Sequence, residues 1–289
     1  MLELYYLIKL RLCRLIIFRI TTSLTQGLIL YIYFYLFQGR THFEIFLLVN
    51  LNSDRIIIIS ISMSGNDMEE YIVKILDIEK VTHDVNKYKV ERPDGYNFIP
   101  GQATEVSINK AGLKDERRPF TFTGLTSWDY LQFIIKSYED HDGVTNILKT
   151  LKPGYELLLH DVWGAINYKG PGVFIAGGAG VTPFISILRN LKHENKISGC
   201  KLIFSNKTSE DIILKDELTS ILGADFINVL TREKNKDYFY GRIDEAFLRE
   251  QISDFSQHFY VCGPDSFVQN INSILLNIGA SADSLVFEK

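Results

Sequence analysis

The alternation of strand-like and helix-like segments after about residue 170 constrains the fold of this chain more than any other feature. Short apolar runs such as "GVFIAGG", "KLIFSN" and "HFYVCGP" each precede a longer segment with helical periodicity. A strand followed by a crossover helix places the next strand parallel to the first. This part of the chain is therefore predicted to be an α/β doubly wound parallel sheet with helices on both faces.

Residues 68 to about 168 show a different pattern, in which most segments are short and strand-like. Short strand-like segments, from "EYIVKILDIEKV" to "YLQFIIKSY", are separated by turn signals such as Pro93-Asp94-Gly95. Segments of this length and spacing are typical of a small antiparallel β-barrel. One helical segment, "DGVTNILKTLKPGYE", interrupts them and is predicted to end at Pro153-Gly154. We predict a barrel domain over residues 68–169 and a parallel-sheet domain over residues 170–289, joined near Gly170-Pro171-Gly172.

Residues 1–67 form a strongly apolar N-terminal extension. Ile20 to Gly39 carries no charge and is about long enough to span a bilayer as a helix. Met63 and Met68 stand just before the first barrel segment, so the upstream residues could also reflect a mis-assigned start. We expect a mis-assigned start or a disordered extension, with a membrane anchor as the alternative. A membrane is expected as a partner only if residues 1–62 are real.

Composition excludes several classes of function. A net charge of -4 and a pI of about 5.9 give no general reason to expect a nucleic-acid partner. Cys13, Cys200 and Cys262 are scattered and form no CxxC pair, so zinc, iron–sulfur clusters and a disulfide framework are not expected. The histidines show no metal-binding spacing, and no metal site is predicted. These features favour a cytoplasmic location, or a membrane-anchored one through the N-terminal segment.

A glycine-rich turn follows the first predicted parallel strand. Glycines let the backbone approach a ligand closely, and the helix that follows offers free N–H groups and a positive dipole end to a phosphate. The spacing is GGxGxxP, which differs from the GxGxxG fingerprint of dinucleotide sites. Taken alone, the turn fits either a nucleotide site or a tight connection. Its residues are Gly177, Gly178, Ala179, Gly180, Val181, Thr182 and Pro183.

Three further fragments carry possible chemistry. The strand-like "RPFT" offers an arginine that could clamp a diphosphate and an aromatic ring that could lie on a planar ligand, although a single strand aromatic is usually core. "GVT" opens the barrel helix and fits an anion site or a simple N-cap. "CGP" ends a parallel strand, where ligands of open α/β sheets bind. Their residues are Arg118, Pro119, Phe120 and Thr121; Gly143, Val144 and Thr145; and Cys262, Gly263 and Pro264.

The order of these fragments, R-x-F-T, G-V-T, GGAGVTP, CGP and a terminal "VFEK", closely resembles the ferredoxin–NADP(+) reductase superfamily. These flavin reductases pair a barrel domain with a nucleotide domain, and the resemblance covers roughly residues 70–289. The stretch "DVWGAINYKGPGVFIAGGAGVTPFI" is particularly similar to the bacterial flavodoxin/ferredoxin reductase branch.

The resemblance implies a bound FAD in the barrel domain. Arg118 would hold its diphosphate, Phe120 would stack on the isoalloxazine where the family usually has tyrosine, and Thr121 would hydrogen-bond near flavin N5. Further flavin ligands implied in this way are Pro119, Ile135, Lys136, Gly143, Val144 and Thr145. Phe287 and Glu288 match the family's C-terminal aromatic and acidic residues beside the flavin.

The resemblance also implies that the glycine turn receives NADPH or NADH transiently. Thr182 and Pro183 would lie close to the nicotinamide, and Cys262 and Gly263 would flank its ring, with Pro264 beside them. Thr121, Cys262 and Glu288 would orient and tune the catalytic site without forming covalent bonds. The ribose pocket is expected at Ser205, Asn206 and Lys207, with Glu210 and Asp211 nearby. Lys207, helped by Arg232, favours NADPH, unless both are solvated loop charges.

The function implied is an FAD-dependent oxidoreductase that takes a hydride from NAD(P)H and passes electrons to a ferredoxin or flavodoxin. One alternative is the reductase component of an oxygenase, or a free-flavin or ferric-chelate reductase. Another is a non-catalytic NAD(P)-binding module, and the presence of both Arg118 and the G-V-T turn speaks against it.

Overall fold

The computed structural model describes the backbone of residues 3–10, 13–20, 28–37, 40–51, 55–64, 70–138, 143–164 and 166–287. It describes the side chains of residues 70–138, 143–164 and 166–286. The chain divides into two compact units, Met1–Glu69 and Glu70–Lys289. The predicted boundary between a barrel domain and a parallel-sheet domain lies inside the second unit and stays a prediction.

The first unit contains a five-stranded antiparallel sheet with its strands in chain order. Aromatic and β-branched residues dominate runs such as "YIYFYLF" and "RIIIIS", which favours extended backbone. The described part of Ile20–Gly39 is strand β3 and the end of β2, not the helix that a membrane anchor was predicted to supply. Within the described residues, no helix combines the length and apolar character needed to cross a membrane. The strands are β1 Glu3–Leu10, β2 Cys13–Ile20, β3 Leu28–Phe37, β4 Arg40–Leu51 and β5 Arg55–Ser64.

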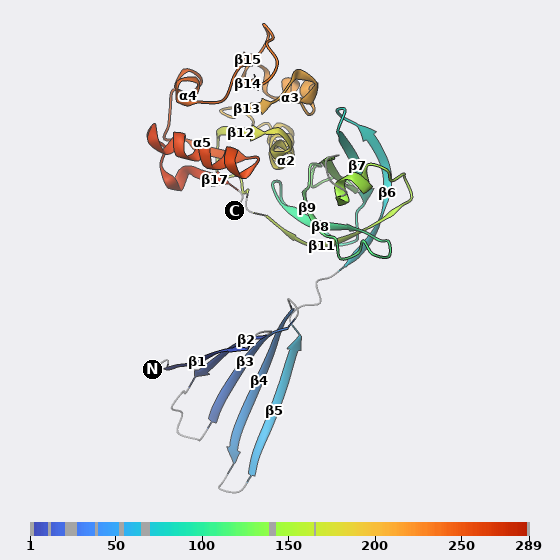
Figure 1. Ribbon diagram of the computed structural model, residues 1–289, viewed down its shortest axis with the longest axis vertical. Helices are drawn as coiled ribbons and strands as arrows, with labels where there is room; N and C mark the ends of the chain where they lie inside the picture. The colour runs from blue at the N-terminus through green and yellow to red at the C-terminus, as the bar shows by residue number, and fades with distance from the viewer. Residues whose placement is uncertain are drawn as a thin grey trace. The chain divides into compact units, whose positions relative to one another are not determined.

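The second unit begins with a six-stranded antiparallel sheet of order β10-β7-β6-β11-β8-β9 (Figure 1). An isolated bridge between Phe122, just after β9, and Phe133, in β10, joins the two edges and closes the sheet into a barrel. Both rings belong to a buried cluster that fills the barrel. The strands are β6 Tyr71–Lys80, β7 Val85–Glu91, β8 Ala103–Ile108, β9 Arg118–Thr121, β10 Tyr130–Lys136 and β11 Glu156–Trp163.

Two features of the barrel differ from the sequence-based expectation. Helix α1 is only Val144–Leu148 and ends well before Pro153-Gly154. The chain leaves it through tight turns, in which the Thr150 and Leu151 N–H groups bond to carbonyls three residues back. Strand β11, which the strand pattern above did not include, lies between β6 and β8 in the sheet.

The rest of the second unit is a six-stranded parallel sheet of order β15-β14-β13-β12-β16-β17. The strands are β12 Gly172–Gly177, β13 Lys201–Asn206, β14 Phe226–Leu230, β15 Phe239–Tyr240, β16 His258–Cys262 and β17 Leu285–Phe287. The α-helices are α2 Thr182–His193, α3 Lys215–Leu222, α4 Glu245–Gln251 and α5 Asp265–Asn277. Short 3-10 turns are η1 Gly178–Val181, η2 Ser209–Asp211, η3 Gly223–Asp225 and η4 Ala282–Ser284.

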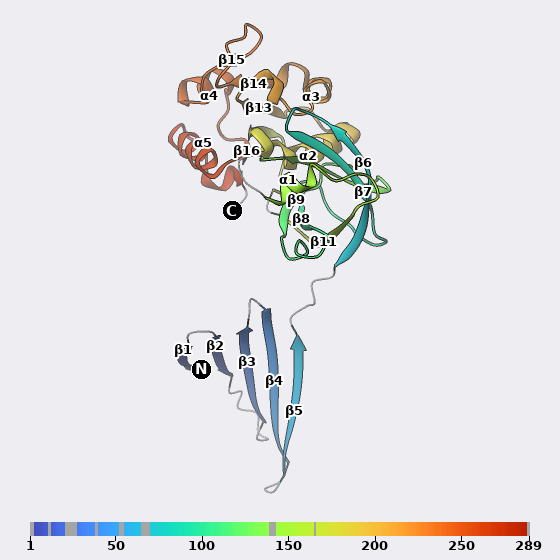
Figure 2. The same ribbon diagram turned by 45° about the vertical axis from the view of Figure 1, so that its right-hand side comes forward.

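Helices cover both faces of this sheet. Phe184 and Leu188 of α2 pack with Leu218 of α3 in one buried cluster, whereas Leu248 of α4 and Leu275 of α5 belong to the cluster on the other face. Helix α2 lies on the face that looks toward the barrel (Figures 1 and 2). The predicted fold class, an antiparallel barrel with one helix followed by a doubly wound parallel sheet, is confirmed.

Helix α2 illustrates how the sequence sets these elements. Its buried side chains are the unbroken run 183–188 and Leu191, and Pro183 lies in its first turn, where a missing N–H costs little. Lys192 and His193 lie in the last turn, where basic side chains interact favourably with the negative end of the helix dipole and so stabilise the helix. Asn195 then takes a left-handed conformation, with φ of 57°, and the chain turns away toward β13.

Candidate functional site

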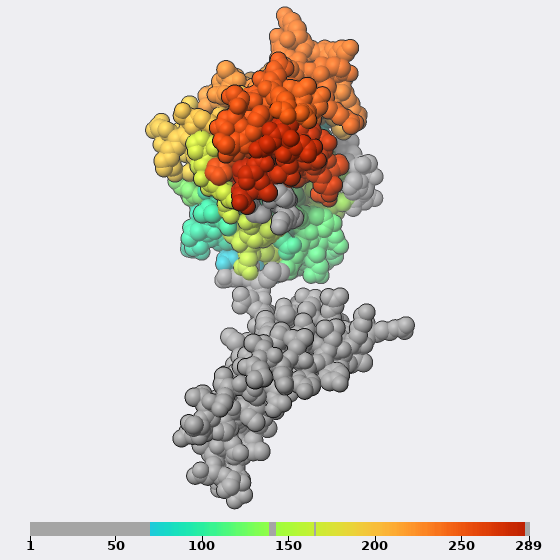
Figure 3. Space-filling view, turned by 90° about the vertical axis from the view of Figure 1, so that its left-hand side faces the viewer, coloured from blue at the N-terminus to red at the C-terminus, as the bar shows by residue number. Residues whose placement is uncertain are grey.

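A cavity of about 820 Å³ lies where the barrel meets the parallel sheet. On the sheet side it opens at the carboxyl ends of β12, β13 and β16. The sheet order reverses between β12 and β16, which is the topological switch point where open α/β sheets bind ligands. On the barrel side the wall comes from β9, β10 and the start of α1. In Figure 3 the orange atoms lie at the end of this unit away from the cyan and green barrel, and the red atoms lie between the two.

The glycine turn forms one wall of the cavity. Gly177, Gly178, Ala179 and Gly180 line it, as do Thr182 and Pro183, while Val181 is fully buried beneath. Gly178 has a left-handed φ of 53°, and a Cβ built on it would meet no described atom within 4 Å. No side-chain oxygen caps the start of α2. The wall is therefore bare backbone at the point where a helix presents its N–H groups.

Gly180 has a different reason to be glycine. A Cβ on it would lie 2.5 Å from the carbonyl carbon of Cys262 and 2.5 Å from the nitrogen of Gly263. The backbone of the turn after β12 thus packs directly against the backbone at the end of β16, with no room for a Cβ atom at Gly180. Cys262, Gly263 and Pro264 all line the cavity, and Cys262 is buried. This close approach brings together two motifs that lie about eighty residues apart in the sequence.

On the barrel side, Pro119, Phe120 and Thr121 of β9 line the cavity. Phe120 is half-buried and also packs against the barrel core. Arg118 is not part of the wall formed by the described residues. Its guanidinium pairs with Glu116 at 3.3 Å and donates to the carbonyl of Arg117 at 2.7 Å, with 45% of the side chain exposed.

Strand β10 and helix α1 complete the barrel wall. Ile135 and Lys136 line the cavity, and so does Thr145. The two residues before Thr145 are placed otherwise: Gly143 is the N-cap of α1, and Val144 is buried in the barrel core.

The far end of the cavity follows β13. Ser205, Asn206 and Lys207 line it. The side-chain amide nitrogen of Asn206 is buried and has no hydrogen-bond partner among the described residues, so it is a donor available to a ligand. Arg232 lies outside the wall formed by the described residues, is exposed, and its N–H donates to the carbonyl of Lys207 at 2.9 Å.

Several lining residues were not predicted. Ile134 and Tyr138 flank the predicted pair in β10, and their place in "YLQFIIKSY" was a usable signal. Asp211 had been noted only as a nearby acidic residue, and Ala103, Thr231 and Phe267 carried no motif. The unpredicted lining residues are Ala103, Ile134, Tyr138, Asp211, Thr231 and Phe267.

Phe287 lies in β17, and nothing further is described of its side chain. Glu288 lies outside the described residues.

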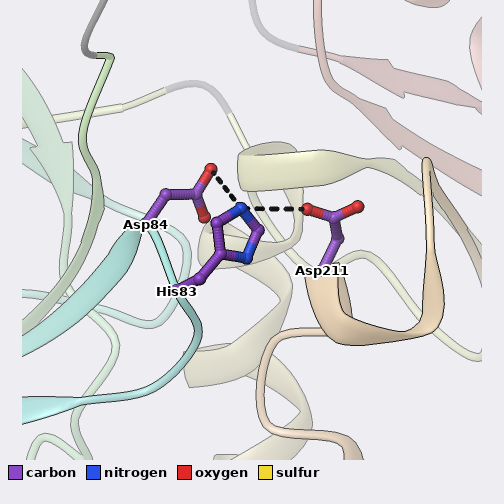
Figure 4. A group of neighbouring side chains, drawn as sticks. All are labelled: His83, Asp84 and Asp211. Carbon is purple, nitrogen blue, oxygen red and sulfur yellow. Dashed lines mark ion pairs between the residues drawn. The ribbon is translucent and has the colours of Figure 1, made fainter.

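A charged group sits at the edge of the cavity, where the turn between β6 and β7 meets η2 (Figure 4). The Nε2 atom of His83 lies 3.6 Å from Asp84 and 3.9 Å from Asp211. Lys136 pairs with Asp84 at 2.7 Å. Burial alone would raise the pKa of Asp84, but the hydrogen bond and charge of Lys136 outweigh burial and lower that pKa. The turn between β6 and β7 thus reaches a carboxylate of the parallel-sheet half through His83.

Comparison with known proteins agrees with this architecture. Residues 174–273 match the family model described as "Oxidoreductase NAD-binding domain". The chain is 24% identical over 259 residues to the reductase component of propane 2-monooxygenase from Rhodococcus jostii, covering 84% of this chain and 68% of that protein. It is 26% identical over 237 residues to NADH-cytochrome b5 reductase 1 from Eremothecium gossypii, covering 74% and 80%. Other reductase components match over about two thirds of their length.

Solved structures share the fold at low identity. A ferredoxin NADP+ reductase from Neisseria gonorrhoeae, solved with FAD and NADP bound, superimposes with a TM-score of 0.68 and 20% identity, covering 76% of this chain and 98% of that one. The cytochrome b5 reductase domain of Ulva prolifera nitrate reductase gives a TM-score of 0.66 at 18% identity, covering 76% and 97%. The second unit of this chain thus has the fold of these reductases, in which an antiparallel barrel precedes a parallel-sheet half, and residues 174–273 of that half match the oxidoreductase NAD-binding domain.

Proposed function

We propose that this protein is an FAD-dependent NAD(P)H oxidoreductase that delivers electrons to a separate redox protein. One observation carries the proposal: a single cavity is lined jointly by the R-P-F-T strand of the barrel, the GGAG turn after β12 and the C-G-P end of β16. Its volume of about 820 Å³ lies within the range of cofactor and ligand sites, about 300–1,000 Å³.

The residues of the barrel wall fit a flavin. Phe120 presents a half-buried ring, and Ile134 and Ile135 add apolar surface. The hydroxyl groups of Thr121 and Thr145 provide donors and acceptors for the ring edge and the chain that follows it. Pro119 and Lys136 complete this wall. We place Arg118 at the diphosphate, which requires its guanidinium to turn from Glu116 toward the ligand.

The residues of the sheet wall fit a nicotinamide nucleotide. The bare backbone at Gly178 and the start of η1, which no side chain caps, suit a diphosphate. The side-chain amide nitrogen of Asn206, which has no partner among the described residues, suits a ribose or base. We place Thr182, Pro183, Cys262 and Gly263 around the nicotinamide, because they line the part of the cavity that both walls share.

FAD, when bound, supplies the chemistry of accepting a hydride from a reduced nicotinamide and of releasing electrons singly or in pairs. The chain's own contribution is orientation and exclusion of water. Cys262 is buried, and the glycine turn packs backbone to backbone against the end of β16, so the shared wall is closely packed. Rigid placement of two reactants can account for a large part of a rate enhancement.

Two charges decide the choice of coenzyme in this proposal. Lys207 and Asp211 line the same end of the cavity. The Oδ2 atom of Asp211 already accepts from the N–H and the hydroxyl of Thr208, each at 2.8 Å. Among the described residues, the Lys207 ammonium forms no hydrogen bond or ion pair, so it can meet a 2′-phosphate, and we propose NADPH. Arg232 would assist only by reorienting, because it lies outside the cavity wall of the described residues.

The acceptor is proposed to be a ferredoxin or flavodoxin in a cytoplasmic compartment. The similar proteins named as reductase components of propane and naphthalene oxygenase systems favour a second candidate, the reductase component of an oxygenase. Both candidates need a protein acceptor, and both differ from a free-flavin or ferric-chelate reductase. Turnover with a ferredoxin or flavodoxin at rates well above those with FMN or ferric citrate would support the first two.

The decisive experiment is spectroscopic. The full chain is purified, mixed with FAD, desalted, and its visible spectrum recorded before and after anaerobic addition of NADPH or NADH. We expect about one FAD per chain and bleaching of its absorption by the coenzyme. A colourless protein that retains no FAD would refute the flavoenzyme proposal, and a yellow protein that neither coenzyme bleaches would refute the reductase.

Arg118→Ala tests the diphosphate assignment. Loss of a charge-assisted hydrogen bond of about 1.5–3 kcal/mol should weaken FAD binding by roughly tenfold or more. Arg117→Ala is the matched control, because Arg117 pairs with Glu70 and Glu105 and does not belong to the described cavity wall. Equal FAD retention in the two variants would overturn the role of Arg118.

A further inference from the structure

Arg189 joins the two walls of the cavity from outside it. The residue lies on α2, and only 10% of its side chain is exposed. Its Nη1 atom donates to the carbonyl of Thr123 and to the side-chain oxygen of Gln132, both at 2.6 Å. Both acceptors are buried residues of the barrel. A single guanidinium therefore satisfies two barrel acceptors from a helix of the nucleotide domain.

A second edge of the same guanidinium is bound by the carboxylate of Glu217. The Nε and Nη2 atoms bond the two carboxylate oxygens of Glu217 in α3, at 2.5 and 2.8 Å. Its carbon lies 5.5 Å from the centre of the Trp128 ring, which belongs to the barrel. A planar fork fixed on two edges and stacked near an aromatic ring keeps one orientation.

One turn earlier on α2, Ser186 makes a second bond across the same boundary. Its hydroxyl accepts from the N–H of Gly101 in the barrel at 3.0 Å and donates to the carbonyl of Pro183 at 3.2 Å. Residues three apart lie on the same side of a helix. Helix α2 is thus docked on the barrel through a defined polar side at Ser186 and Arg189.

The partners of Arg189 belong to the elements that form the cavity. Thr123 follows Thr121 by two residues, and Gln132 lies in β10 shortly before Ile134 and Ile135. On the helix, Arg189 stands six residues after Pro183, about 9 Å along the axis at 1.5 Å per residue. A shift of Arg189 would therefore move Thr182 and Pro183 relative to β9 and β10.

We propose that Arg189 is a positioning residue, which sets the spacing between the flavin wall and the nicotinamide wall of the cavity. This inference rests on the proposed function. Arg189 does not line the cavity of the described residues, so it acts through the strands and helix it joins. Displacement by about 1 Å can slow an oriented reaction by about a hundredfold.

Arg189→Gln is the test variant, and flavin reduction by NADPH or NADH in anaerobic stopped-flow is the first measurement. We expect the limiting reduction rate to fall by at least about tenfold, with FAD content and the coenzyme concentration for half-maximal rate changing less than about threefold. Arg189→Lys keeps a donor for the barrel carbonyls and should recover part of the rate. Hydrogen exchange gives a second readout without turnover: peptides spanning residues 99–103 and 121–125 should exchange faster in Arg189→Gln.

Two comparison variants make the result specific. Arg249→Gln removes an exposed Arg–Glu pair of the same chemistry on α4, and it should leave rate and exchange unchanged. Glu217→Gln weakens only the α2–α3 edge of the guanidinium and should slow reduction less than Arg189→Gln. An Arg189→Gln protein that reduces at the wild-type rate would overturn the inference. So would parallel losses of FAD and rate, or an equal effect of Glu217→Gln. Failure of the wild-type protein to hold FAD would refute the proposed function instead.

Discussion

At the scale of single residues, Gly178 and Gly180, which lie two positions apart in the sequence, are glycine for different reasons. Gly178 needs its left-handed backbone and faces open space, whereas Gly180 has the backbone of Cys262 and Gly263 where its Cβ would stand. The same residue type therefore leaves the backbone open at one position and allows two backbone segments to pack closely at the other.

Substitutions at these glycines should separate stability from coenzyme binding. Gly180→Ala places a methyl group 2.5 Å from backbone atoms that cannot yield cheaply, so overpacking of about 1–3 kcal/mol should lower the Tm by roughly 2–12 °C. Gly178→Asn keeps a residue that accepts left-handed φ but places a side chain at the bare wall. It should leave the Tm nearly unchanged and raise the KM for the coenzyme about tenfold or more. Thermal unfolding and initial rates check both; a Tm loss in Gly178→Asn as large as in Gly180→Ala would contradict the distinction.

Lys207 carries the prediction on coenzyme choice. Lys207→Ala should raise the KM for NADPH by about tenfold, because a charged hydrogen bond to a 2′-phosphate is worth about 1.5–3 kcal/mol. The KM for NADH should change less than about twofold, since that coenzyme has no such phosphate. Arg232→Ala is the natural comparison and should have the smaller effect on NADPH. Equal sensitivity of both coenzymes to Lys207→Ala would refute the assignment.

At the scale of elements, β11 holds a histidine that the proposed chemistry does not use. His160 is 1% exposed, and neither ring nitrogen has a hydrogen-bond partner among the described residues. Burial lowers the pKa of His160, and the charge of Arg117 lowers it further, while Glu70, Glu105 and Asp161 partly oppose this. The folded barrel therefore holds a neutral imidazole that the unfolded chain protonates more readily.

The barrel should lose stability as the pH falls below about 6.5, the ordinary pKa of histidine. Between that value and the lower folded pKa, the unfolded state binds more protons than the folded state, so acid favours unfolding; above 6.5 the contribution is fully present. His160→Gln cannot titrate and should flatten the pH dependence of the urea midpoint in this window. Carboxyl groups with lowered pKa values, such as Asp84, act at lower pH. An unchanged pH profile in His160→Gln would contradict the prediction.

At the scale of the whole molecule, the described buried clusters belong to the second unit. All residues of its three hydrophobic clusters lie between Val73 and Val286. Two of these clusters each lie within one half of the unit, whereas the third also contains Val85 and Ile134 of the barrel, so apolar packing connects the halves together with polar contacts such as those of Arg189.

A chain of residues 68–289 should therefore fold and keep the proposed site. We expect its FAD content and its reduction by coenzyme to match those of the full chain, and the Tm of its main transition to differ by no more than a few degrees. Absorption spectra and calorimetry of the two proteins, side by side, provide the check. Aggregation of the shorter chain or loss of FAD would show that residues 1–67 contribute to the site or its stability.

The sequence by itself determined the fold class and most of the cavity. Period-two segments and strand–helix alternation depend on local burial, which the order of residues records directly. The wall-forming motifs R-P-F-T, GGAG and C-G-P could be found because each is a short continuous run next to a strand end. Helix α1 was overestimated, because its apolar spacing continued beyond the point where backbone turns ended it.

The tertiary structure alone decided which of these residues share a wall. It placed Arg118 beside Glu116 and Arg232 outside the described cavity wall, and it added Tyr138, Asp211 and Phe267. It also joined Arg189 to Thr123 and Gln132, more than fifty residues away in the chain. Such placements depend on how the barrel docks on the sheet and on competition among charged neighbours. Neither the docking nor the choice of charged partner can be predicted from a local sequence pattern, because a side chain pairs with another only after the backbone has brought the two close together.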